Sequence, residues 1–263
     1  MRSKRTWQPW VVTLSAVVMV VGTMAGLGLL GTRVEESSGG ALAADATLLA
    51  PATTAFSIWS LIYVGLFAYV VWQWWARQSE RAARISWLAA LSMLLNAAWL
   101  GVTQLGWLWV SVVVILALAL VLGLLMRRLT EDRPESWIEA VVVDGTFGVY
   151  LGWVSVASVA NVTAALVGSG IDPGGVWSEV VAAIVLAVAA LLGALFAFRL
   201  GGRWAIAVAM AWAMGWIAVG RLAAPPLSTV TAVAAILAGL AILAVTGYVA
   251  SRRLSQRAGT RHR

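Results

Sequence analysis

Long stretches without any charged residue constrain this chain more than any other feature. Asp, Glu, Lys and Arg are absent from positions 6–32, 46–76, 85–126, 145–171, 180–198, 204–220 and 222–251. A helix needs about 20 apolar residues to cross the hydrocarbon core of a bilayer. Charged residues make up 11% of the chain, whereas a soluble domain typically carries about 25%. We therefore expect an integral membrane protein, with the longest of these stretches divided into two spans near residues 103–106.

The spans are expected to be helices, because none shows the alternating apolar and polar residues of a membrane-barrel strand. The predicted fold is all-α, an eight-helix transmembrane bundle with helices at 9–31, 54–76, 85–103, 107–127, 138–167, 178–198, 203–221 and 228–250. The first apolar run also imitates a signal peptide, with Ala41-Leu42-Ala43 as a cleavage site. That run is longer than a typical signal sequence, so we expect a retained first helix.

The basic residues predict the orientation of the bundle. If the N-terminus is cytoplasmic, 16 of the 18 Lys and Arg residues lie on the cytoplasmic side of the membrane. Only Arg33 and Arg221 lie on the external side. Cytoplasmic loops carry such an excess of basic residues. We therefore predict a bacterial-type inner (plasma) membrane protein with both termini in the cytoplasm. The net charge of +7 then indicates attraction to anionic cytoplasmic lipids, and we expect no nucleic-acid partner.

Few residues in the spans offer reactive chemistry. The chain has no cysteine, and its single histidine, His262, lies one residue from the end, so we expect neither a disulfide nor a metal site. Asp144 is the one acidic residue well within a predicted span, where an acid is often functional. Its position near the cytoplasmic end favours a solvated or arginine-paired residue over a proton relay. Arg221 is expected among the outer headgroups.

Tryptophan is unusually frequent, with 16 residues. Most fall near predicted helix ends, where the amphipathic indole ring favours the headgroup interface. Five lie closer to span interiors: Trp59, Trp99, Trp153, Trp212 and Trp216. Three helices also place aromatic and polar residues on one face, by spacings of three, four or seven: Phe56, Trp59, Tyr63, Phe67 and Trp74; Ser92, Asn96, Trp99 and Thr103; and Tyr150, Trp153, Ala157 and Asn161.

These stripes have two interpretations. In the first, they pack helices together, and Asn96 and Asn161 bridge helices by hydrogen bonds. In the second, they line a pocket in which aromatic rings stack on a flat, mostly apolar ligand that a few polar groups orient. Spacing alone leaves both open.

Three motifs resemble those of one membrane family. PATTAFSIWSLIY (51–63), LNAAWL (95–100) and VYLGWVSVASVAN (149–161) occur in order on the second, third and fifth predicted helices. They are similar to motifs of the tryptophan-rich sensory protein (TspO/MBR, translocator protein) family, and the resemblance covers about residues 8–168. The long loop between the first two helices fits the same family.

The resemblance implies a fold, a ligand class and a partner. Family members are five-helix bundles, often homodimers, that bind porphyrins, sterols and synthetic aromatic ligands beneath the first loop. The implied domains are a five-helix TspO/MBR-like domain at 1–168, three additional transmembrane helices at 169–251 and a basic cytoplasmic tail at 252–263. The implied ligand-binding residues are Trp59, Tyr63, Asn96, Trp99, Tyr150, Trp153, Ala157 and Asn161. No cofactor is required, although a porphyrin or haem-like molecule is an expected ligand.

Some residues depart from the family pattern. Val149 stands where a proline is common, Thr54 and Ala55 stand where a tryptophan or glycine is frequent, and the family's sterol-linked motif is missing after the fifth helix. The leading hypothesis is a membrane-embedded binding protein or sensor for a planar lipophilic ligand such as a tetrapyrrole. A transporter of such a compound is the main alternative. A light-dependent porphyrin-degrading enzyme comes third, because no catalytic constellation is visible in the spans.

Overall fold

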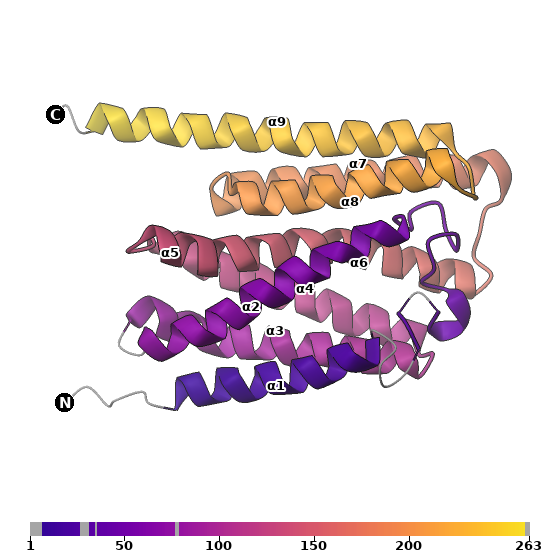
Figure 1. Cartoon of the computed structure of the whole chain (residues 1–263). Coiled ribbons are helices and arrows are strands. Elements are labelled where there is room, and N and C mark those ends of the chain that lie inside the picture. The colour runs from indigo at the N-terminus through magenta and orange to yellow at the C-terminus, as the bar shows by residue number, and fades with distance from the viewer. Residues whose placement is uncertain (1–6, 27–31, 35, 77–78, 261–263) are drawn as a thin grey trace.

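The computed structural model describes residues 7–26, 32–34, 36–76 and 79–260, and its long helices run roughly side by side (Figure 1). Among these residues, seven helices are long and apolar enough to cross a membrane, and the apolar stretch of the first helix, Gln8–Met24, is shorter. The predicted all-α membrane bundle is confirmed. The end of the first predicted helix, residues 27–31, lies outside the described residues.

The N-terminal part consists of α1 (Gln8–Gly26), η1 (Ser38–Gly40), η2 (Thr53–Ser57), α2 (Ile58–Trp75), α3 (Glu80–Gln104), α4 (Leu108–Glu131), α5 (Trp137–Glu139), η3 (Ala140–Gly145) and α6 (Thr146–Gly168). Helix α3 packs between α1 and α4, α4 also packs on α6, and α2 contacts both α1 and α6. Helix α3 begins five residues before the predicted start, because the Ser79 hydroxyl caps it by accepting a hydrogen bond from the Ala82 amide.

The predicted fifth helix, 138–167, contains a π-helical segment. Residues 137–168 form one continuous span, but Ala140–Gly145 adopt the wider π-helical turn. Such turns are often found at functional sites, because the extra residue redirects the side chains that follow it. Here the turn contains Asp144.

The C-terminal helices are α7 (Gly175–Leu200), α8 (Trp204–Ala223) and α9 (Thr229–Thr260). Helix α8 packs on α6 and on α9, whereas α7 packs mainly on α9 and makes few contacts with α4 or α6. Gly148 and Gly152 let α6 and α8 approach closely, since a Cβ atom at Gly152 would lie 2.4 Å from the carbonyl oxygen of Ile206. Helix α9 continues through the predicted tail to Thr260.

Helix α6 is the centre of the bundle. It is in contact with α2, α4 and α8, and residues 150–156 are buried throughout. Helix α1 begins, and α9 ends, at the same end of the molecule, while the α1–α2 loop lies at the opposite end (Figure 1). Helix α6 therefore has neighbours from both halves of the chain.

Candidate functional site

Four of the predicted site residues surround the ring of a fifth, Trp59 on α2. The Trp59 ring is stacked on Tyr63 at a centroid distance of 5.4 Å and on Trp99 of α3 at 6.4 Å. It meets Tyr150 and Trp153 of α6 edge-on, at 5.9 and 6.2 Å. Edge-on and stacked arrangements at these distances are the favourable geometries for aromatic pairs. We call these five rings the aromatic cluster.

The stripe on α2 ends at Tyr63. Phe56 completes one edge of the aromatic cluster, with its ring 5.8 Å from that of Trp153. Phe67, by contrast, is 70% exposed, and Trp74 contacts the ring of Trp10 on α1. The predicted α2 stripe is thus partly wrong: its second half faces lipid or α1 instead of the interior.

Asn161 acts as a bridge between helices. The indole N–H of Trp99 donates to Oδ1 of Asn161 at 2.8 Å, and Nδ2 of Asn161 donates to the Ser111 hydroxyl of α4 at 2.9 Å. All three side chains of this bridge are buried. The packing interpretation therefore holds for Asn161. Ser111 was not singled out in the sequence, because a lone serine in an apolar helix gives no signal of its partner.

Asn96 and Trp153 differ from Asn161, because their polar atoms make no hydrogen bond of acceptable geometry, although the Tyr150 hydroxyl lies near the Asn96 amide. Asn96 is fully buried, yet neither its amide oxygen nor its amide nitrogen makes a hydrogen bond of acceptable geometry among the described residues. The indole N–H of the buried Trp153 is also unpaired there. Tyr150 reaches the same face of α3, donating its hydroxyl to the Ser92 carbonyl at 3.3 Å. Buried polar groups are nearly always paired, so an unpaired group in the aromatic cluster and another on Asn96 beside it need an explanation.

A small cavity of about 40 Å³ lies between the aromatic cluster and the loop that joins α1 to α2. Of the predicted site residues, it is lined by Trp59, Trp99, Trp153, Ala157 and Asn161. Tyr63, Asn96 and Tyr150 do not line it. Pockets for drug-sized ligands typically measure about 300–1,000 Å³. The cavity is closed to such a ligand in this conformation.

The loop between α1 and α2 forms the roof of this cavity, with Leu42, Thr47, Ala50 and Pro51 among its lining residues. Hydrogen bonds attach this loop to two helices. The Ser38 hydroxyl donates to the Thr103 carbonyl of α3 at 2.9 Å. At the start of the same loop, the Thr32 amide donates to the Gln104 side chain of α3 at 3.0 Å, and Gln104 donates back to the Thr32 carbonyl at 2.8 Å. The attachments to α8, in the C-terminal part, lie further along the loop.

Arg221 of α8 provides the main attachment. Its two terminal nitrogens donate to the carbonyls of Thr47 and Ala44 at 3.0 and 2.7 Å. The side chain is only 1% exposed, so the expected position among outer headgroups is wrong. A guanidinium can satisfy several carbonyls at once, and this is why a charged residue is tolerated there. Its position within a long apolar stretch was the available signal.

Two tryptophans of α8 complete the attachment of the roof. The indole N–H of Trp212 donates to the Ala55 carbonyl at 3.1 Å. The Ala52 amide donates to the Trp216 carbonyl, also at 3.1 Å. The rings of Trp212 and Trp216 contact each other edge-on at 5.6 Å. Opening the roof would therefore break contacts with the C-terminal part of the chain.

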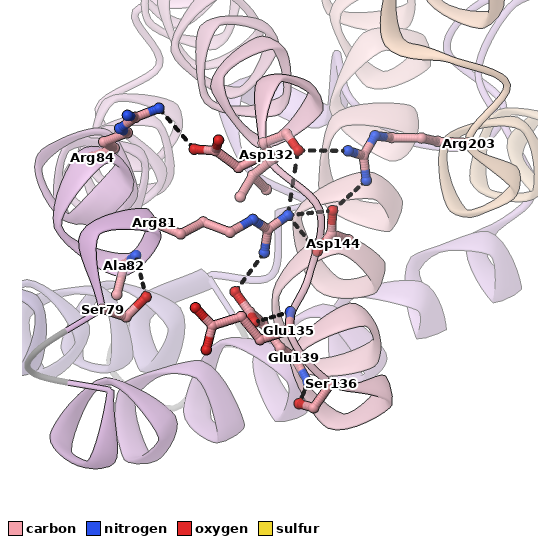
Figure 2. A network of polar contacts seen from close by, with 11 residues as sticks. Ser79, Arg81, Ala82, Arg84, Asp132, Glu135, Ser136, Glu139, Asp144 and Arg203 are labelled. Carbon is pink, nitrogen blue, oxygen red and sulfur yellow. Dashed lines mark hydrogen bonds and ion pairs between the residues drawn. The ribbon is translucent and has the colours of Figure 1, made fainter. Parts of the chain in front are cut away.

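A cluster of ion pairs (Figure 2) lies next to α5, at the end of the bundle opposite to the roof loop (Figure 1). Arg81 of α3 forms ion pairs with Glu139 at 2.7 Å and with Asp144 at 2.8 Å. Arg203, at the start of α8, also pairs with Asp144. Both arginines donate to the Leu129 carbonyl. Asp144 is thus arginine-paired and buried, and the cluster joins α3, the π-helical turn and α8.

The cluster of ion pairs and the aromatic cluster differ in what they can do chemically. The ion-pair cluster has two cations and two anions, and its acids are held by arginines, which suits a structural connection. The aromatic cluster has flat apolar faces and unpaired polar groups, which suits ligand binding. Among the described residues, no group of three or more His, Cys, Asp or Glu is arranged to hold a metal ion.

Comparison with known proteins gives one match. A family model described as TSPO-like protein matches residues 8–246, which include the aromatic cluster and all three C-terminal helices up to the last part of α9. The comparisons with curated proteins and with solved structures give no match.

Proposed function

Because the chain belongs to the TSPO-like protein family, we propose that it binds a planar lipophilic ligand, such as a porphyrin or a sterol-like compound, at the aromatic cluster. In this proposal it acts as a membrane-embedded sensor. The family match supports the kind of protein, and the arrangement of the site supports the kind of ligand.

The unpaired polar groups carry this proposal. An unpaired amide or indole N–H in a buried site costs about 1–3 kcal/mol. Asn96 and Trp153 have this cost in the ligand-free protein. A ligand with a polar edge and a flat apolar face would remove it, since it could pair with Asn96 while its face stacks on Trp59. A purely packing role for Asn96 would rest on its contact with the Tyr150 hydroxyl, which is not a hydrogen bond of acceptable geometry.

Binding also requires the site to open. The cavity of about 40 Å³ is close to the size that holds one water molecule. We propose that the roof loop moves away from the aromatic cluster when ligand enters. This movement would break the roof's hydrogen bonds to α3 and α8, so ligand binding would change contacts in both halves of the bundle.

Asn96→Leu tests the proposal. This substitution keeps the size of the side chain and removes both polar atoms. We expect protoporphyrin affinity to fall by about tenfold or more, which corresponds to about 1.4 kcal/mol for a lost ligand hydrogen bond. The thermal stability of the ligand-free protein should stay the same or rise, because an unpaired buried amide is removed. Affinity is measured by protoporphyrin titration of purified protein in detergent.

Asn161→Leu is the matched control. It makes the same chemical change at a buried asparagine that is already paired with Trp99 and Ser111. We expect it to lower thermal stability, because it leaves the Trp99 indole N–H unpaired. If Asn96→Leu instead destabilises the protein and leaves protoporphyrin affinity unchanged, Asn96 has a packing role and the proposal is wrong.

Transport of the same ligand is the second candidate. The observation that favours it is the attachment of the roof to α8 through Arg221, Trp212 and Trp216. This contact would couple opening of the site to movement of the C-terminal helices. Uptake of protoporphyrin into liposomes that contain the protein distinguishes transport from sensing.

Catalysis is the weakest of the three proposals. The five rings of the aromatic cluster offer only indole and phenol groups, and none of them is a nucleophile held next to a base. Light-dependent breakdown of a bound porphyrin would depend on Trp59 and Trp153. Illuminating the complex and following the porphyrin absorbance tests this directly.

A further inference from the structure

A large groove separates α7 from the N-terminal helices. It has a volume of about 1,230 Å³ and lies between α4, α6 and α7, where α7 makes few contacts with either neighbour. None of the eight predicted ligand-binding residues lines it. Lining residues on α7 extend from Gly175 to Arg199, a rise of about 36 Å. The groove therefore spans the hydrocarbon core, which is about 30 Å thick.

The middle of the groove is apolar and faces the bilayer. Its α4 wall includes Leu116, Leu120 and Leu124, which are 43–64% exposed in the protein alone. Gly123 widens this wall, because a Cβ atom there would meet nothing within 4 Å. In a membrane, an open apolar groove of this kind is filled by hydrocarbon.

Two arginines define one end of the groove. Arg127 of α4 and Arg199 of α7 are exposed and line it. Neither forms an ion pair with any described residue. They lie close to the point where α4 meets α7, because the Thr130 hydroxyl, three residues after Arg127, donates to the Leu200 carbonyl at 3.5 Å. This end is also the end at which α9 terminates (Figure 1).

The other end of the groove is acidic. Asp45, Asp172 and Glu179 line it. The Ser178 hydroxyl and the Gly174 amide donate to the Asp172 carboxylate and lower its pKa below the ordinary value, so it stays charged at neutral pH. An anionic headgroup would be repelled at this end and attracted to the arginine end.

We propose that the groove is a binding site for one anionic phospholipid, with the phosphate between Arg127 and Arg199 and the acyl chains along α4 and α7. Basic pockets between transmembrane helices bind anionic headgroups in this way. The opposite charges at the two ends set the direction in which the lipid lies. The apolar groove between them accommodates the chains.

The arginines are tested with phosphatidylglycerol and phosphatidylcholine as probes. Each arginine near an anionic headgroup contributes about fivefold in affinity, so Arg127→Gln/Arg199→Gln should lower the preference for phosphatidylglycerol by roughly 30-fold. Native mass spectrometry of the full-length protein in equimolar lipid measures the lipids retained. The matched control, Arg128→Gln/Arg252→Gln, removes the same charge at the same end, outside the groove, and should change the preference by less than about threefold.

The chain site is tested by filling the groove. Gly123→Phe should displace the retained lipid, whereas Gly101→Phe should not, because Gly101 is equally free of neighbours but does not line the groove. The proposal is overturned if the parent protein retains both lipids equally, or if the two arginine variants behave alike. It is also overturned if Gly123→Phe changes the oligomeric state and leaves lipid retention intact, since a second copy would then occupy the groove.

Discussion

Asp144 and Arg221 are both charged residues inside an apolar bundle, and each is stabilised in a different way. Asp144 forms ion pairs with Arg81 and Arg203. Arg221 is paired with backbone carbonyls of the roof loop. A buried charge is costly unless it is paired and hydrogen-bonded. Each residue therefore fixes the position of whatever it pairs with: the start of α8 in the first case, the roof in the second.

Asp144→Asn should destabilise the protein by about 3 kcal/mol, because it leaves buried Arg81 and half-buried Arg203 with one carboxylate, that of Glu139, between them. Thermal unfolding in detergent measures this. Asp132→Asn is the control, since Asp132 pairs with Arg84 at an exposed position, where a pair contributes about 0–1 kcal/mol. Protoporphyrin affinity should change by less than about threefold in both variants. Equal stability of the two variants would show that the buried cluster does not hold α8 in place.

At the scale of the helix, contact between α6 and α8 is what joins the two halves of the chain. Gly148 and Gly152 are on α6, and Ile206 and Ala209 of α8 occupy the space that side chains at these positions would fill. Close approach through small residues is the usual way in which helices associate in lipid, where the hydrophobic effect gives little drive. Helix α7 lacks such a contact with α6, and the groove results.

Gly152→Ala should therefore destabilise the bundle by about 1–3 kcal/mol, the typical cost of overpacking. The new Cβ atom would lie 2.4 Å from the Ile206 carbonyl oxygen, and backbone cannot move aside as a flexible side chain can. Gly215→Ala on α8 is the control, because its Cβ atom would meet nothing within 4 Å. An unchanged melting temperature for Gly152→Ala would mean that α6 and α8 separate easily.

At the scale of the whole molecule, the charge-free stretches were sufficient to predict the helices. The predicted helices differ from the observed ones mainly at their ends, because capping residues and turns determine where a helix begins and ends. The π-helical turn at Ala140–Gly145 was not predicted, because the helical spacing of this span gives no signal of it, and the arginines that pair with its Asp144 come from positions distant in the sequence. The extension of α9 to Thr260 was missed, because charged residues were taken to end the helix.

The site could be predicted in part. Helical spacing and the family motifs identified the aromatic cluster, since periodicity fixes which residues share a face. They did not separate Asn96 from Asn161, although one is unpaired and the other bridges α3 and α4. Pairing between helices depends on three-dimensional positions that spacing does not contain. For the same reason, the roof's attachment to Arg221 was missed.

The orientation of the molecule remains a prediction from its charges. The structure places the start of α1 and the end of α9 at one end (Figure 1), and the basic residues predict that this end is cytoplasmic. Reporter fusions after Arg81, Glu131, Arg199 and Arg257 should then be cytoplasmic, and fusions after Ser38, Asp172 and Leu227 should be external. An external reporter after Arg257 would contradict this topology.

The most direct test of the account is whether the aromatic cluster binds the ligand. Trp59 and Trp153 are replaced by alanine one at a time, and protoporphyrin affinity is measured in detergent by quenching of tryptophan fluorescence. Loss of a stacking ring at a buried binding site should cost about 2 kcal/mol or more, roughly 30-fold in affinity. Trp107→Ala should bind nearly as the parent does, because Trp107 is exposed at a helix end. Equal affinity for all three variants and the parent would contradict the account.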